Sequence, residues 1–236
     1  MNKALAPIGL GLMCKPPRPG TSKTRLAAGI GADAAAKLSK AFLTDCAHVA
    51  WTAAVQSSLE LKAFYKPSDA TKELGEILGP RWPLELADAA SLGAIMCDIV
   101  GRILTACPAG AIIMGTDIPM IGADVIQTAA RHLRTGNERS IVIAPSVDGG
   151  YCLIGARTLE AAAPLFEDMA WSTPQVLDET LRRARAERLD VTLLDMQRDV
   201  DELPDLHWLR EAIVAQPDRA MATRHVMSTL VIPAEK

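Results

Sequence analysis

Short apolar segments alternate with longer helical segments along most of the chain, and this alternation limits the fold more than any other feature. The short segments are bounded by turn residues, as strands are, and they cover residues 7–14, 58–65, 111–115, 140–144, 151–154 and 189–194. Helical patterns cover residues 24–52 (interrupted near Gly29 and Gly31), 91–106, 123–134, 174–188 and 204–215, whereas residues 66–83 are expected to be irregular or to hold a short helix. This order predicts an α/β protein of three layers, with a mostly parallel, doubly wound sheet between layers of helices.

The length and composition suit one domain with a substantial core. The chain has 236 residues, of which 49% are hydrophobic and 22% charged, so disorder is not expected. We expect a single domain over residues 1–215. The tail at 216–236 has no clear pattern, and we expect it to be mobile or to take part in a homodimer contact.

The charges and cysteines exclude several classes of protein. A net charge of −3 without a long run of one sign gives no basis for gripping nucleic acid or an anionic membrane. The N-terminal apolar run ends at Lys15, which is too early for a transmembrane helix, and it lacks the cleavage pattern of a signal peptide. Five scattered cysteines without a CxxC pair indicate free thiols in a cytoplasmic protein.

Polar loops follow the apolar strands, and in a doubly wound sheet ligands bind beyond the carboxyl ends of the strands. The first such loop, at 15–25, is rich in basic residues and is shaped by prolines and a glycine. It is a candidate phosphate site, whose residues would be Lys15, Arg18, Gly20, Thr21, Lys23 and Arg25. It is not a Walker A loop, because Ser22 stands where a glycine should precede the lysine. The alternative interpretation is a solvated basic turn.

Acidic residues follow two other strands and are candidate metal ligands. Asp117 ends the central strand at 111–115, where a carboxylate suits Mg²⁺ or Mn²⁺, although it would also suit a turn before Ile-Pro. Asp199 and Asp201 are alternate residues of an extended segment, so both can face one cation. Such a pair is more often a solvated acidic turn, and Glu202 and Asp205 would equally cap the last helix.

Two further segments are candidates for substrate binding. Asp148, Gly149, Gly150 and Tyr151 form a loop whose glycines permit close approach to a ligand, although Asp-Gly is also a hairpin signal. The segment Trp171, Ser172 and Thr173 precedes a helix, which Ser172 or Thr173 is expected to cap, while Trp171 is expected to pack rather than stack on a base. The four histidines are isolated, so nucleophilic hydrolase chemistry has little support.

Taken in order, these motifs resemble those of a known family. The stretches are PRPGTSKTRL (17–26), AFLTD (41–45), MGTDIP (114–119), APSVDGGYCLIGA (144–156), LFEDMAWSTPQVLDET (165–180) and DVDELPDL (199–206). The chain resembles the GT-A-like proteins called selenodomain-associated transferase 1, or arsenosugar-type glycosyltransferases. The resemblance implies a nucleotide-diphospho-sugar transferase fold and a metal-dependent reaction on a nucleotide-activated donor.

The resemblance also implies roles for individual residues. Lys23 and Arg25 would lie near phosphates, and Asp117 would hold Mg²⁺ or Mn²⁺, with Asp199 and Asp201 completing the metal site. Asp148, Gly149 and Gly150 would lie near the acceptor or sugar, and Asp148 is a candidate general base. Lys23, Asp117 and Asp148 are therefore the candidate catalytic residues.

One stretch departs from the family pattern. A Gly-Asp-Leu-Gly-x-Arg motif is expected before the central helix, but residues 90–95 read ASLGAI, so the acid and the arginine are missing. Arg81 and Trp82 lie close by in the sequence and are candidates to replace them. The leading hypothesis is glycosyl transfer from a nucleotide-sugar to a small acceptor. Nucleotidyl transfer from an NTP to a small phosphate or phosphonate is the second, and a non-catalytic binding or scaffold protein is the third.

Overall fold

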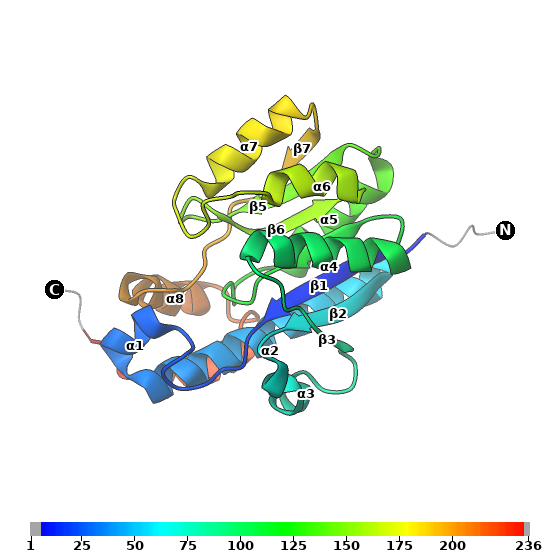
Figure 1. The fold of residues 1–236 in the computed structure, drawn as a ribbon. Helices are drawn as coiled ribbons and strands as arrows, with labels where there is room; N and C mark the ends of the chain where they lie inside the picture. Colours follow the sequence, from blue (N-terminus) through cyan, green and yellow to red (C-terminus); the bar gives the residue numbers. More distant parts are fainter. Residues whose placement is uncertain (1–5, 234–236) are drawn as a thin grey trace.

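The computed structural model describes residues 6–233 and contains one seven-stranded sheet (Figure 1). The strands lie in the order β3-β2-β1-β4-β6-β5-β7, and β6 runs antiparallel to both of its neighbours while the other pairs are parallel. Their bounds are β1 Ile8–Cys14, β2 Leu59–Tyr65, β3 Leu84–Leu86, β4 Ala111–Met114, β5 Ser140–Pro145, β6 Tyr151–Ala156 and β7 Asp190–Leu193. The register places Leu10 between Leu61 and Ile112.

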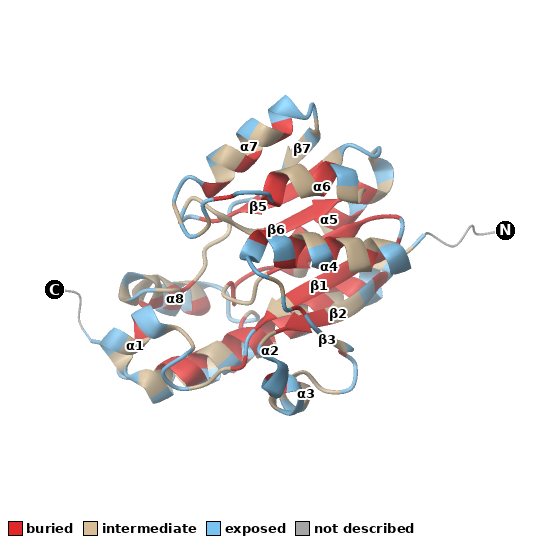
Figure 2. Ribbon diagram, viewed as in Figure 1, coloured by how far each residue is buried: buried red, intermediate tan, exposed pale blue. Residues whose placement is uncertain are grey.

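Helices cover both faces of the sheet, which confirms the predicted three-layer α/β fold. Residues of α2, α3 and α5 share one apolar core with the sheet, and residues of α4, α6 and α7 share the other (Figure 2). A third cluster joins α1, α8 and α9 to the N-terminal half of α2. The helices are α1 Thr24–Ile30, α2 Ala32–Ser57, α3 Thr71–Leu78, α4 Leu92–Ala106, α5 Ala123–Thr135, α6 Leu159–Phe166, α7 Val176–Ala186, α8 Leu203–Ala215 and α9 Met221–Met227, with a 3₁₀ turn at Ser68–Ala70.

The central strand β1 explains why the first apolar segment is rich in glycine. Ile8, Leu10 and Leu12 point to one face and are fully buried. The glycines between them face α4, and a side chain at Gly9 would overlap Ile103 of that helix. The glycines therefore let α4 pack directly on the sheet, which sets the position of its N-terminal end beside the end of β1.

The structure differs from the sequence-based expectations at several elements. β3, α6 and α9 were not expected. The tail after residue 215 forms α9, which packs against α2 because Asp45 accepts hydrogen bonds from the backbone N–H groups of Ala222 and Thr223. The prediction that Ser172 or Thr173 caps the next helix is wrong. That helix, α7, begins only at Val176, with Gln175 as its N-cap, because the Thr173 hydroxyl donates instead to the carbonyl of Ala170 in a preceding turn.

No helix within residues 6–233 combines the length and the apolar character needed to cross a lipid bilayer. The five cysteines are free thiols.

Candidate functional site

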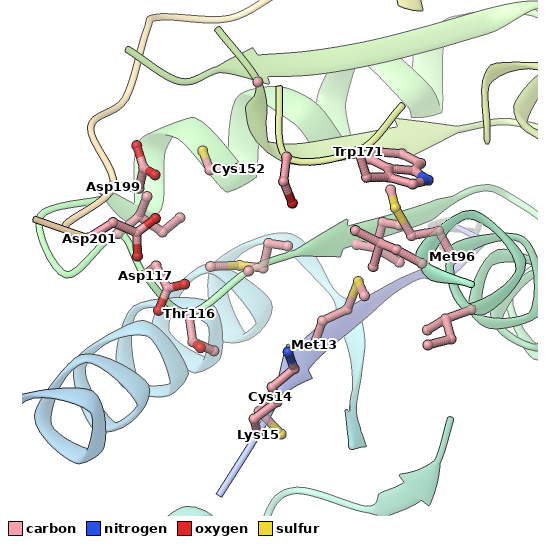
Figure 3. Close-up of a pocket in the computed structure, with 18 of the residues that line it drawn as sticks. Met13, Cys14, Lys15, Met96, Thr116, Asp117, Cys152, Trp171, Asp199 and Asp201 are labelled. Carbon is pink, nitrogen blue, oxygen red and sulfur yellow. The ribbon is translucent and has the colours of Figure 1, made fainter. Parts of the chain in front are cut away.

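The predicted loops that carry residues 15–25, Asp117, Asp148 and Asp199 meet at one cleft of about 860 Å³ beyond the carboxyl ends of β1, β4 and β5 (Figure 3). Almost all of the predicted site residues line it. These are Lys15, Arg18, Thr21, Lys23, Arg25, Asp117, Asp148, Gly150, Tyr151, Trp171, Ser172, Thr173, Asp199 and Asp201. Gly20 and Gly149 do not line the cleft, although each shapes a loop that does.

Lys23 lies at the centre of the charged part of the cleft. Its Nζ is 2.6 Å from Asp117 Oδ1 and 2.7 Å from Asp201 Oδ1, and the lysine side chain is only 5% exposed. Burial by itself would lower the pKa of Lys23, but the charges of Asp117 and Asp201 outweigh burial and raise that pKa. The cleft therefore contains a fixed positive charge held by two carboxylates.

Asp199 lies beside Asp201, and within residues 6–233 it makes no ion pair with a cation. The Ser146 hydroxyl donates to Asp199 Oδ1 at 2.5 Å. Burial raises the pKa of Asp199 to about 6, and the charges of Asp148 and Asp201 add to this effect, while the Ser146 bond opposes it. Burial also favours a higher pKa for Asp201, but the Lys23 charge reverses this and lowers it. Negative charge thus exceeds positive charge at this end of the cleft.

The side chains of segment 199–201 alternate in direction, as the sequence predicts. Val200 is fully buried, and its N–H donates to the carbonyl of Asp117 at 2.8 Å. Its two neighbours therefore present their carboxylates on the side of the cleft (Figure 3). The backbone bond fixes the loop of Asp117 against the loop of Asp199 and Asp201.

The other basic residues of loop 15–25 are largely neutralised by acids. Arg18 pairs with Asp69 at 3.1 Å and with Glu73 at 2.9 Å, and these hydrogen bonds raise the arginine pKa. Arg25 pairs with Glu202 at 3.0 Å in an exposed position. Within residues 6–233, Lys15 makes no ion pair while it lines the cleft.

The Asp148 loop is a hairpin turn that also borders the cleft. It joins β5 to the antiparallel β6, and Asp148 Oδ1 accepts the N–H of Gly150 at 2.9 Å. Gly149 has a φ of 87°, and a side chain there would overlap the carbonyl of Pro174. The motif is therefore a tight hairpin turn whose Asp148 and Gly150 line the cleft.

Trp171 borders the part of the cleft farthest from the carboxylates (Figure 3). Its ring meets the ring of Tyr151 edge to face, with 6.3 Å between centroids. Arg183 of α7 fixes the preceding turn, because its guanidinium donates to the carbonyls of Pro164 and Asp168 at 3.3 and 3.2 Å. Trp171 therefore extends from an anchored turn.

The segment that lacks the expected acid and arginine forms the start of α4. Ser91 caps this helix by accepting the N–H of Ala94 at 3.2 Å. Arg81 and Trp82 do not replace the missing groups: neither lines the cleft, the Arg81 guanidinium lies over the Trp51 ring at 4.6 Å, and Trp82 is buried in the core.

Some lining residues were missed in the sequence. Met13, Leu92, Ile95, Met96 and Ser146 line the cleft. Ser146 could have been found as the first polar residue after β5. The apolar residues carry no local signal, since apolar side chains near strand ends and helix starts usually belong to the core.

No group of three or more His, Cys, Asp or Glu side chains in the described part of the chain is spaced to bind a metal ion. The Lys23 amine instead lies between Asp117 and Asp201.

Comparisons with known proteins agree with this architecture. A structure of a candidate nucleotide-diphospho-sugar transferase from Desulfovibrio desulfuricans G20 is similar over 94% of each chain, with a TM-score of 0.84 and 27% identity. A cytidylyltransferase from Leptospira borgpetersenii has a TM-score of 0.58 at 11% identity, covering 96% of this chain and 99% of that one. A nucleotidyl transferase from Methanothermobacter has a TM-score of 0.56 at 14% identity, covering 88% and 98%. The fold is thus that of the nucleotide-diphospho-sugar transferases, as the motifs imply.

No curated protein sequence matches the chain significantly. A protein-family model does match, over residues 47–173, which include β2 to β6 and the loops of Asp117, Asp148 and Trp171. The chain belongs to the family described as "Uncharacterized protein conserved in bacteria (DUF2064)".

Proposed function

We propose that this protein is a transferase that uses a nucleotide-activated donor, and that it moves a glycosyl group from a nucleotide-sugar to a small acceptor. The observation that carries the proposal is the buried Lys23 amine, held between Asp117 and Asp201 where the four loops meet. A fixed ammonium at this edge of the sheet suits the diphosphate of the donor, because such charges stabilise a phosphate leaving group without reorganising. The similarity to the Desulfovibrio protein supports a nucleotide-sugar as donor.

We propose that Mg²⁺ or Mn²⁺ binds at the same end of the cleft. Asp117 and Asp201 pair with Lys23. The pKa of Asp199 is raised by burial and further by the charges of Asp148 and Asp201. Hard carboxylate oxygens are the ligands that these ions prefer. We propose that Asp117, Asp199 and Asp201 would hold the ion beside the Lys23 ammonium. The bound ion would supply Lewis-acid stabilisation of the diphosphate.

The ion pairs of loop 15–25 favour a diphosphate over a triphosphate. Arg18 and Arg25 are engaged by acids outside the loop, so Lys15 and Lys23 are the cations best placed for phosphate. With these two arginines engaged, fewer free cations remain to balance the larger negative charge of a triphosphate. In the transfer, the acceptor hydroxyl oxygen forms a bond to the sugar carbon, the carbon–oxygen bond to the diphosphate breaks, and Asp148 takes the hydroxyl proton.

Nucleotidyl transfer is the second candidate. The observation in its favour is that Lys15, Arg18, Lys23 and Arg25 all line the cleft, so four cations would face a triphosphate if their ion pairs exchanged. The two reactions have different products, since nucleotidyl transfer releases pyrophosphate and glycosyl transfer releases a nucleoside diphosphate.

The first test is thermal unfolding of the purified protein with NTPs and nucleotide-sugars, each with and without Mg²⁺ or Mn²⁺. We expect a metal-dependent rise in Tm with nucleotide-sugars, because a ligand that binds only the folded state stabilises it by mass action. Asp117→Asn should abolish the rise, while Asp33→Asn, at an exposed site on α2, should preserve it. A rise with NTPs alone would favour nucleotidyl transfer. No rise with any ligand at millimolar concentration would leave the non-catalytic binding or scaffold hypothesis.

A further inference from the structure

The cleft has two ends of different chemistry. One end carries Lys23 and the three carboxylates already described. The other, which we call the apolar end, is lined by Met13, Leu92, Ile95, Met96, Tyr151 and Trp171. Figure 3 shows Asp117, Asp199 and Asp201 together on one side, Met96 and Trp171 on the other, and Met13 between them.

Three separate elements build the apolar end and are held close together. Met13 is near the end of β1, Leu92, Ile95 and Met96 lie on the first turns of α4, and Trp171 extends from the turn after α6. Gly93 allows this contact: a side chain there would overlap the Phe166 carbonyl and come within 3.3 Å of Trp171 Nε1. The wall formed by α4 and the wall formed by Trp171 are therefore in close contact at one side of the cleft.

The charged side chains that line the cleft come from loops outside the apolar end. The charged residues that line the cleft are Lys15, Arg18, Lys23, Arg25, Lys66, Asp117, Asp148, Asp199 and Asp201, and none of them comes from α4 or from residues 171–176. Leu92 is 40% exposed at the mouth of this region, and Met13, Tyr151 and Trp171 are partly exposed. Covering such surface by an apolar ligand is favourable, because it removes apolar area from water.

The side chains at the apolar end suit a flat ring system. Aromatic faces and edges bind rings in stacked or edge-to-face arrangements, and methionine sulfur makes favourable contacts with rings while adapting its shape. A nucleobase also has a ring, but its polar edge needs several hydrogen-bond partners. The apolar end offers few side-chain donors, and the Tyr151 hydroxyl is buried. An apolar ring therefore fits better than a base or a sugar.

We propose that the apolar end binds a flat apolar ring system that belongs to the acceptor, so that the acceptor is an aryl or fused-ring alcohol. This proposal rests on the transferase function proposed above, because it assigns the second substrate of the same cleft. The acceptor's ring lies between Met96 and Trp171, and its hydroxyl faces the end that carries Asp148 and the donor. The missing arginine at the start of α4 agrees with this proposal, because Ile95 stands at its position and lines the ring site.

The test uses 2-naphthol as the probe, titrated into the nucleotide-free protein by isothermal calorimetry. We expect one site per chain, at least ten-fold weaker in Leu92→Arg, because the new charge would be desolvated by the ring. Leu92→Gln, a milder change, should weaken binding in the same direction if the arginine variant folds poorly. The matched control is Val214→Arg, since Val214 is 74% exposed on α8 and does not line the cleft. Absence of binding at millimolar naphthol, or equal binding by Leu92→Arg and wild type, would overturn the proposal.

A second arm repeats the titration with saturating ADP, CDP, GDP or UDP and Mg²⁺. We expect naphthol and one nucleotide to bind together, with the naphthol Kd changed by less than about three-fold. Displacement of naphthol by the nucleotide would mean that the apolar end holds the base, and would overturn the assignment to an acceptor. Naphthol binding by a protein that binds none of the nucleotides would support the ring site while overturning the transferase function, so the two failures are distinguishable.

Discussion

The amine of Lys23 lies 2.6 Å from the carboxylate of Asp117, and this ion pair links the loop after β1 to the loop after β4. The same amine lies 2.7 Å from Asp201, which is 178 residues away in the chain. One buried lysine thus connects three of the loops around the cleft. A divalent ion would compete with this lysine for the same carboxylates, whereas a phosphate would compete with the carboxylates for the lysine.

Replacing Lys23 should therefore increase the affinity for a metal ion in the absence of nucleotide. In Lys23→Met the repulsion between the ammonium and an incoming cation is lost, and Asp117 and Asp201 are free to bind it. We expect the Kd for Mn²⁺ to fall about ten-fold, which corresponds to about 1.4 kcal/mol. Electron paramagnetic resonance of free Mn²⁺ measures it directly. Lys37→Met removes an exposed cation of α2 that does not line the cleft, and it should change the Kd by less than about two-fold. An unchanged or weaker Mn²⁺ affinity in Lys23→Met would exclude the three carboxylates as the metal site.

The central part of the fold follows from local sequence signals, whereas its edges do not. The buried strands β4 and β5 are continuous apolar runs, and these predict buried strands almost residue by residue. The edge strand β3 has only three residues and pairs with β2 alone. Three residues are too few to show the alternation of apolar and polar side chains that is typical of a strand. Helix α6 contains Pro164, and a proline inside a segment argues against predicting a helix there.

In the site, too, local features can be predicted from the sequence, whereas contacts between distant residues cannot. Loop positions and the alternation around Val200 are local properties, and the sequence predicts that these loops converge at the cleft. The partners of the basic residues are not local: Arg18 bonds to Glu73, 55 positions away, and Lys23 bonds to Asp201. The apolar end depends on Gly93, whose importance is visible only once α4 and Trp171 are neighbours.

Gly149→Ala should destabilise the protein more than Gly20→Ala. Both glycines have a positive φ, at 87° and 78°, so either substitution costs about 1 kcal/mol of backbone strain. A methyl group at Gly149 would in addition overlap the carbonyl of Pro174, whereas nothing lies within 4 Å of the same position at Gly20. We expect Gly149→Ala to lower the free energy of unfolding by roughly 2–3 kcal/mol in all, since overpacking adds a penalty of similar size. Urea unfolding of the two variants compares them, and equal losses would mean that the hairpin turn moves freely away from Pro174.

The stability that Glu179 provides should disappear in acid. Hydrogen bonds from Arg182 and Arg183 hold the pKa of Glu179 at about 2, below its ordinary value of 4.5. A lowered pKa in the folded state stabilises the fold fully above pH 4.5, and this contribution falls as the pH drops toward 2. Glu179→Gln should therefore be less stable than wild type at pH 7, and by pH 3 that difference should shrink by roughly half or more. Chemical unfolding at both pH values measures the difference. Glu211→Gln, at an exposed position without an ion pair in the described residues, should show no such pH dependence. If the stability difference between Glu179→Gln and wild type is the same at both pH values, the effect of Glu179 is not electrostatic.

Asp45→Ala should loosen the loop of Asp117 although the two residues belong to different elements. Asp45 is 6% exposed and accepts hydrogen bonds from Ala222 and Thr223, at 2.9 and 2.8 Å. These bonds hold α9 against α2, and next to α9 the guanidinium of Arg219 donates to the carbonyl of Met120 at 2.9 Å. Loss of two bonds to a buried carboxylate should lower the free energy of unfolding by about 2–4 kcal/mol.

Hydrogen exchange provides the local measurement for this last variant. In Asp45→Ala we expect faster exchange both in α9 and at the amides of Ile121 and Val200, because Met120, Val200, Ala220 and Met227 belong to one apolar cluster. Asp33→Ala, at an exposed position on the same helix α2, should leave those amides unchanged. If exchange increases in α9 alone, the tail is an independent addition to the domain. If it increases at Ile121 and Val200 as well, the residues after 215 form part of the cooperative unit that positions Asp117 and Asp201.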